Sequence, residues 1–317
     1  MNVRNFIEEH YRHFNAGALA ACIRSLEEFL HNGGKLVVTL AGAMSTAEIG
    51  RTLAPAIRAG LVHGISCTGA NLEEDVFNLV ARDDYEDVDW RNMSANDESK
   101  LQKRGMNRVT DTCIPEVEAV RTVEKILLNK WLDAEKSGDC KPPHEYLIEV
   151  IKSGKLKFQA NPDDCWVIAA NDMKIPIFTP GWADSTLGNI FSARLIDGVI
   201  TNDRIITTDL QRMNDLALWY SKQKCPVGLL QVGGGIAGDF PICVVPMLRQ
   251  DLGEKVELWG WFAQISESTP SYGGYSGAPP NEKISWEKLG VDTPKFVIES
   301  DATIVLPLIL TYLLEGS

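Results

Sequence analysis

The chain has 317 residues, of which 44% are hydrophobic and 23% charged, so it can bury a sizeable core and is not disordered. Its 43 acidic residues against 31 basic ones give a net charge of -12, which disfavours a nucleic-acid partner and favours cationic ligands. The cysteines are scattered without a Cys-x-x-Cys pair, so neither a disulfide framework nor a zinc site is predicted.

The apolar pattern of the first third predicts helices that alternate with buried strands. In chain order we expect helices at 3–14 and 19–31, a strand at 35–40, a helix at 46–59, a strand ending at Cys67 and a helix at 72–80. Residues 81–110 are rich in Asp, Asn, Ser, Lys and Arg, and they predict a long polar connection of the kind that is often functional.

The same alternation continues to the C-terminus. A helix at 116–135 and a linker at 136–143 are expected before strands at 175–178, 227–231, 256–263 and 295–299, with helices between them. This order is typical of an α/β fold with a Rossmann-like, largely parallel sheet flanked by helices. We expect one domain over 1–317, with N-terminal helices in 1–34 packing on the α/β core.

Two absences bear on location and metal binding. The first ten residues lack the apolar core of a signal peptide, and no stretch reaches the roughly 20 apolar residues of a membrane span. The apolar run 303–314 contains Pro307 and is predicted to be a buried helix that closes the fold. The histidines show no metal-ligand spacing. A cytoplasmic protein with no metal and no membrane partner is therefore expected.

The segment Gly233 to Gly238 matches the glycine fingerprint G-x-G-x-x-G and follows a strand-like run. Open parallel sheets bind ligands at the carboxyl ends of their strands, where helix N-termini also meet phosphates. Glycines at these positions equally suit tight packing between strand and helix, so the motif alone leaves both interpretations open.

The segment 281–288, Asn-Glu-Lys-Ile-Ser-Trp-Glu-Lys, is the leading candidate for covalent chemistry. A neutral lysine amine attacks carbon–nitrogen or carbon–oxygen double bonds, and Lys288 is the candidate nucleophile. Trp286 is suited to cover a substrate ammonium and Glu282 to pair with another. Lys and Glu in a polar loop are more often solvated and Trp more often packs, so residue types alone do not decide.

These residues resemble the catalytic segment of the deoxyhypusine synthase family. The matching blocks are Ser276-Gly277-Ala278, Asn281-Glu282, Ser285-Trp286 and Lys288, with further similar stretches at 68–75, 105–108, 175–188, 233–235 and 301–307. Ordered blocks over so much of the chain are more specific than any single one. The resemblance implies the deoxyhypusine synthase fold, NAD as cofactor, and a homotetramer whose active sites are shared between subunits.

The resemblance also implies which loops contact NAD. The matching positions are Gly42, Ala43, Met44, Ser45, Thr46, Thr68, Gly69, Ala70, Glu74, Asp184, Gly234, Asp301 and Ala302. Where the family has Ser-Asn, this chain has Gly42-Ala43. Asp301 also suits the N-cap of the helix that follows, and Glu74 the first turn of its own helix. These structural roles are compatible with cofactor contact.

For the amine, the resemblance implies catalysis by Lys288 in a pocket that departs from the family pattern. The implied substrate-binding residues are Glu73, Glu74, Asn189, Asp239, Gly273, Gly274, Tyr275, Glu282 and Trp286. Asn189 and Tyr275 replace family acids, and Asp239 replaces a histidine. Each lost carboxylate removes a charge-assisted hydrogen bond worth about 1.5 to 3 kcal/mol, which argues against spermidine as the preferred substrate. Glu74 or Asp239 is then the candidate general base.

The implied reaction is a redox-neutral transfer, in which hydride passes to NAD, Lys288 takes up the aminoalkyl group as an imine, and a second amine accepts it. With the altered pocket we expect an NAD-dependent aminoalkyl transferase of polyamine metabolism, for example one that forms homospermidine, and a guanidino amine such as agmatine is a further possible substrate. Two alternatives stay open: an authentic deoxyhypusine synthase that modifies a protein lysine, and a noncatalytic paralogue that regulates a partner. The retained Lys288 favours catalysis, whereas the altered Asn189, Asp239 and Tyr275 favour the paralogue.

Overall fold

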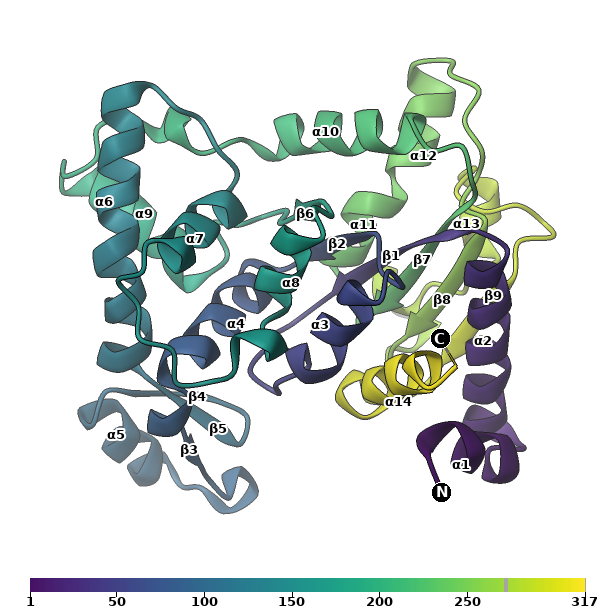
Figure 1. Ribbon diagram of the computed structural model, residues 1–317, viewed down its shortest axis with the longest axis horizontal. Helices are drawn as coiled ribbons and strands as arrows, with labels where there is room; N and C mark the ends of the chain where they lie inside the picture. Colours follow the sequence, from purple (N-terminus) through teal and green to yellow (C-terminus); the bar gives the residue numbers. More distant parts are fainter. Residues whose placement is uncertain (271–272, 317) are drawn as a thin grey trace.

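The computed structural model describes residues 1–270 and 273–316, and its centre is a six-stranded parallel sheet (Figure 1). Across the sheet the strands are β6 (Ile177–Phe178), β2 (Gly64–Cys67), β1 (Lys35–Leu40), β7 (Val227–Val232), β8 (Trp261–Ile265) and β9 (Lys295–Ile298). The chain builds outward from β1 to β6 and then returns to the other side of β1. This order is that of the Rossmann fold, so the expected α/β class is confirmed, and the topological switch point lies between β1 and β7.

Alternate residues of the strands enter two cores on opposite faces of the sheet. Leu36, Val38 and Leu40 of β1 belong to one core, and Val37 belongs to the other. The helices of the first core are α2 (Phe14–His31), α3 (Gly50–Arg58), α4 (Gly69–Ala81), α8 (Trp166–Asp172) and α14 (Ala302–Leu314). Those of the second are α10 (Asp209–Ser221), α11 (Ile236–Ile242) and α12 (Val244–Pro246). Strands buried on both faces read as continuous apolar runs, which made them recognisable in the sequence.

The remaining helices extend these layers. Helix α1 (Val3–His10) contacts α14, so the two ends of the chain lie side by side (Figure 1). Beyond the β6 edge lie α6 (Thr122–Ser137), α7 (Pro143–Lys152) and α9 (Thr186–Ile196), the last packed against α4. No helix in the described ranges is both long and apolar enough to span a membrane. Nor do these ranges contain a cluster of three or more potential metal ligands.

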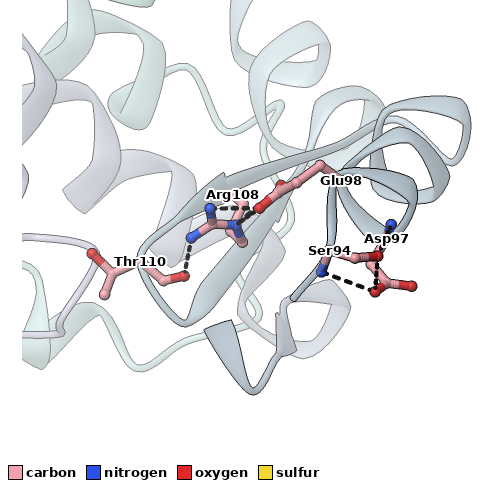
Figure 2. Close-up of polar contacts among 5 residues, drawn as sticks. All are labelled: Ser94, Asp97, Glu98, Arg108 and Thr110. Atoms are coloured by element: carbon pink, nitrogen blue, oxygen red, sulfur yellow. Dashed lines mark hydrogen bonds and ion pairs between the residues drawn. The ribbon is translucent and has the colours of Figure 1, made fainter. Parts of the chain in front are cut away.

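The prediction that residues 81–110 form an irregular polar connection was wrong. It forms a small antiparallel sheet, β3-β5-β4, with one helix; the elements are β3 (Glu86–Asp87), α5 (Ala95–Lys103), β4 (Met106–Val109) and β5 (Thr112–Pro115). Ser94 and Asp97 form a capping box at the start of α5. Arg108 donates from Nη2 to Glu98 Oε1 at 2.6 Å and from Nη1 to the Thr110 carbonyl at 2.5 Å (Figure 2). Local polar contacts and a small apolar cluster of Leu101, Met106 and Cys113 therefore organise this unit.

Several predicted boundaries also need correction. The strand expected at 256–263 begins only at Trp261, because the parallel pairing with β7 starts there. The helix expected at 46–59 begins at Gly50, and the residues before it form turns. A π-helical turn (Glu116–Arg121) precedes α6, where a continuous α-helix was expected.

Candidate active site

A cavity of about 590 Å³ lies between α11, α12 and the segment that carries α13 (Glu282–Ser285). Several of the predicted site residues line it: Asp239, Gly273, Gly274, Tyr275, Glu282, Trp286 and Lys288. Met213, Met247 and Pro246 add apolar wall, and Asp251 adds a further carboxylate. The cavity thus combines apolar walls, acids and a lysine, which suits an aliphatic amine.

Lys288 places its amine inside this cavity, with only 9% of the residue exposed. Its Nζ lies 3.7 Å from Asp239 Oδ1, 5.7 Å from the centre of the Tyr275 ring and 5.8 Å from that of Trp286. Cys243, one helical turn after Asp239, donates its thiol to the same carboxylate oxygen at 3.6 Å. Trp286 is 60% exposed, so part of its ring is free to cover a cationic ligand.

Hydrogen bonds fix the segment before α13 against the sheet. Tyr275 donates from its hydroxyl to Gln231 Oε1 at 2.8 Å, and burial raises the pKa of this phenol well above its usual value. Ser276 Oγ accepts from the Gly235 N–H at 3.1 Å. A Cβ on Gly234 would lie 1.6 Å from Ser276 Oγ, so only glycine allows this approach. The packing interpretation of the glycine motif therefore holds at Gly234, which also lines a second cavity.

Lys283 is a cavity residue that the sequence analysis missed. Only 3% of it is exposed, and its Nζ lies 5.0 Å from the centre of the Tyr275 ring and 5.1 Å from that of Phe262. Burial, followed by the charge of Lys288, lowers the pKa of Lys283 to about 8. In sequence it resembles any lysine of a polar loop, and no local signal marks it as buried.

Two further cavities open at the carboxyl ends of the parallel strands. One, of about 460 Å³, is lined by predicted cofactor residues that follow β1, namely Ala43, Met44 and Thr46, and by Asp301. The other, of about 390 Å³, is lined by Gly233, Gly234, Asp301 and Ala302 among others. Asp301 caps α14 by accepting the Thr303 N–H at 2.7 Å, as the sequence indicated. A switch-point crevice with glycines, hydroxyls and a helix N-terminus fits the ribose and phosphate groups of a dinucleotide.

Asn71, which the sequence analysis also missed, holds the loop after β1 in place. It is fully buried, and its Nδ2 donates to the carbonyls of Leu40, Ala41 and Gly42 at 2.9 to 3.1 Å. Its Oδ1 accepts from the Ser45 N–H at 3.0 Å. One side chain thus satisfies four backbone groups of the loop that borders the 460 Å³ cavity.

The acids Glu73 and Glu74 were both predicted to contact substrate, and the structure gives them different surroundings. Glu73 accepts the N–H groups of Thr186 and Leu187 at 2.8 Å each, at the N-terminus of α9. Burial raises the pKa of Glu73. Glu74 accepts the hydroxyl of Thr46 at 2.7 Å, and burial raises its pKa to about 8. Only Glu74 is therefore bonded to a residue that lines a cavity.

The other predicted residues lie away from the lysine cavity. Asn189 is exposed on α9 and donates to the carbonyls of Ala183 and Ser185, and Asp184 is exposed beside it. Helices α9 and α13 lie at opposite sides of the main sheet (Figure 1). Among the positions near α4, Thr68 caps that helix and donates to the Gly42 carbonyl. Three more predicted cofactor residues lie near α4. Ser45 is buried and accepts the Trp166 indole N–H, Gly69 packs on Ser185, and Ala70 is half-buried.

The sheet has the Rossmann strand order, and the crevice at its switch point suits a dinucleotide. The buried lysine in its own cavity suits covalent amine chemistry. The family model for deoxyhypusine synthase matches residues 7–313. The chain belongs to the deoxyhypusine synthase family, as the sequence resemblance indicated, and membership places it among transferases.

Individual relatives agree with this assignment. A deoxyhypusine synthase-like protein of Nostoc punctiforme is 26% identical over 99% of this chain and 80% of the relative. A probable deoxyhypusine synthase of Archaeoglobus fulgidus is 28% identical over 95% of this chain and 90% of the relative. The crystal structure of a putative deoxyhypusine synthase from Entamoeba histolytica superposes with a TM-score of 0.59 over 98% of this chain and 92% of that one, at 14% identity, which supports the fold alone.

Proposed function

We propose that this chain is an NAD-dependent aminoalkyl transferase that acts on a small polyamine through an imine at Lys288. The observation that carries the proposal is the buried Lys288 amine, which faces a cavity of about 590 Å³ beside the Asp239 carboxylate and two aromatic rings. A lysine in this setting can attack an imine and hold the substrate covalently. Family membership supports the transferase class.

When bound, NAD would supply the acceptor for hydride from the carbon beside a substrate amine and return that hydride at the end of the cycle. The Lys288 amine adds to the substrate imine, and the original amine leaves, so the aminoalkyl group is held on Nζ. A second amine then adds and displaces Lys288. The Asp239 carboxylate, 3.7 Å from Nζ, stabilises the positive charge that forms on the Lys288 amine in these steps and is then lost. The apolar wall around it limits hydrolysis by water.

The lining of the cavity supports a small amine as acceptor. Asp251 and Glu282 are available to pair with ammonium groups, while Tyr275 stands where the resemblance implies an acid. A di- or triamine fits this volume, and transfer to a diamine such as putrescine would give homospermidine. Modification of a protein lysine is the alternative, and it requires the acceptor lysine to reach Lys288 through the same opening.

Oligomerisation would explain where the remaining predicted residues act. Helix α9, which carries Asn189 and begins two residues after Asp184, lies at the opposite side of the main sheet from α13 (Figure 1). In a homotetramer with shared sites, as the resemblance implies, these residues would complete the cavity of a neighbouring subunit. A cytoplasmic location agrees with the use of NAD and polyamines.

Borohydride trapping tests the proposal directly. The protein is incubated with NAD and a panel of diamines and triamines, reduced, and analysed by intact mass and peptide mapping. Lys288→Ala is the test variant, and Lys155→Ala, an exposed lysine outside the cavity, is the matched control. We expect an aminoalkyl adduct on Lys288 in the wild type and the control, and none without NAD. No adduct with any amine, despite NAD binding, would favour the noncatalytic paralogue.

A further inference from the structure

Lys283 shares the cavity of Lys288 but lacks a counter-ion. In the described ranges no carboxylate lies within 4.0 Å of its Nζ, whereas Lys288 has Asp239 at 3.7 Å. The one hydrogen bond that Nζ makes to those residues goes to the carbonyl of Ala278, at 3.2 Å. A buried charge without an ionic partner is unfavourable, so this 3% exposed amine loses its proton more readily than an exposed lysine does.

Aminoalkyl transfer needs a neutral proton acceptor in the cavity. Amine substrates arrive as ammonium ions, and only the free amine can lose hydride from the adjacent carbon. The lining residues that the structure describes include no histidine, and the position where the family has one carries Asp239. Asp239 already faces the Lys288 amine and accepts the Cys243 thiol. This leaves Lys283 as the amine without a fixed ionic partner.

We propose, resting on the function proposed above, that Lys283 is the general base of this cavity and takes a proton from the bound substrate ammonium. In this step one N–H bond of the substrate breaks, one N–H bond forms on Lys283 Nζ, and the substrate keeps the electron pair as a free amine. The proton is returned when the product amine leaves. No oxidant or further reactant is needed.

Burial and the charge of Lys288 lower the pKa of Lys283, whereas the charges of Glu282 and Asp239 raise it, and the lowering effects prevail. Lys288 and Glu282 share its segment, Asp239 faces it from α11, and the rings of Tyr275 and Phe262 enclose it. Both lysine amines lie against one Tyr275 ring, at 5.0 and 5.7 Å from its centre. The lowered pKa of Lys283, about 8, is the range in which a lysine exchanges protons near neutral pH.

The test is the pH dependence of the first hydride transfer, followed by the absorbance of NADH in single turnovers with 1,4-diaminobutane as probe. Lys283→Met removes the base, and Lys283→Arg keeps a positive charge that cannot accept a proton. Lys155→Met is the control. At about pH 7.5 we expect both Lys283 variants to be slowed roughly 100-fold and the control to match the wild type. Toward the pKa of the free diamine, at about pH 10, the variants should recover because the substrate arrives deprotonated.

A second measurement does not depend on turnover. NMR titration of ¹³C-labelled lysine side chains, assigned with Lys283→Met, should give a midpoint of about 8 for Lys283. An ordinary midpoint of about 10.4, or a Lys283→Arg variant with the wild-type rate and pH profile, would overturn the inference alone. If the wild type reacts with no amine, the proposed function is wrong and the inference falls with it. NAD binding and urea midpoints show whether each variant is folded.

Discussion

Replacing Glu73 tests whether this acid binds substrate or holds the fold. Glu73→Ala removes a 2% exposed carboxylate that accepts two N–H groups at the start of α9, each at 2.8 Å. Each buried donor left unsatisfied costs about 1 to 3 kcal/mol, and relief of the carboxylate's own burial offsets part of the loss. We therefore expect the free energy of unfolding to fall by about 2 to 4 kcal/mol. Glu73→Gln should lose about half as much, because the amide oxygen still accepts one N–H.

Urea denaturation followed by circular dichroism measures this loss. Glu98→Ala is the control, since its carboxylate is 42% exposed and pairs with Arg108, and such surface pairs contribute about 0 to 1 kcal/mol. The reasoning would be refuted if Glu73→Ala kept wild-type stability while losing affinity for amines. That result would place Glu73 in the substrate site, as the sequence alone predicted.

Three further changes probe other parts of the site. Gly234→Ala should lower adduct trapping at least tenfold, about 1.4 kcal/mol, because the new Cβ displaces Ser276; trapping at the wild-type rate would contradict this. Asn71→Ala should weaken NAD binding and lower stability by about 2 to 4 kcal/mol, measured by calorimetry and urea, whereas unchanged NAD affinity would count against its role in the cofactor loop. Glu74→Gln should flatten the pH dependence of stability. In the folded protein the pKa of Glu74 is raised from 4.5 to about 8. The protonated Glu74 therefore contributes fully to the free energy of unfolding below pH 4.5. As the pH rises from 4.5 toward 8, this contribution falls by up to about 1.4 kcal/mol per pH unit. Parallel wild-type and variant urea curves across that range would refute the assignment.

The sequence predicted the strands that are buried on both faces and failed where pairing, not hydrophobicity, defines a strand. β1 (Lys-Leu-Val-Val-Thr-Leu) and β7 (Val-Gly-Leu-Leu-Gln-Val) are largely apolar, and their positions were predicted to within a residue. β3 is Glu86–Asp87, and β4 exposes Asn107 and Arg108, so neither has an apolar signal. Their backbone groups are satisfied by antiparallel pairing with β5, which only the folded chain provides.

The candidate site divides in the same way. Lys288, Trp286 and Glu282 were identified because the motif around them resembles a family, and the structure places them on one cavity. Lys283 and Asn71 lie inside recognised segments, 281–288 and 68–75, but were given no role there, because their importance comes from burial and from tertiary partners. Asn71, for example, bonds to carbonyls 29 to 31 residues away. Such contacts exist only after β1 and α4 have packed together.

Three consecutive acids on α4 show how tertiary partners separate structural from functional roles. Glu73, Glu74 and Asp75 are all buried, which is costly for carboxylates unless each finds donors. Glu73 accepts a backbone N–H at the N-terminus of α9. Asp75 accepts the Cys165 thiol at 2.8 Å and a backbone N–H. Glu74 instead bonds to Thr46, which lines the cavity of about 460 Å³. Since hydrogen-bond donors of the fold satisfy Glu73 and Asp75, Glu74 is the acid of this run for which we propose a role at the cavity.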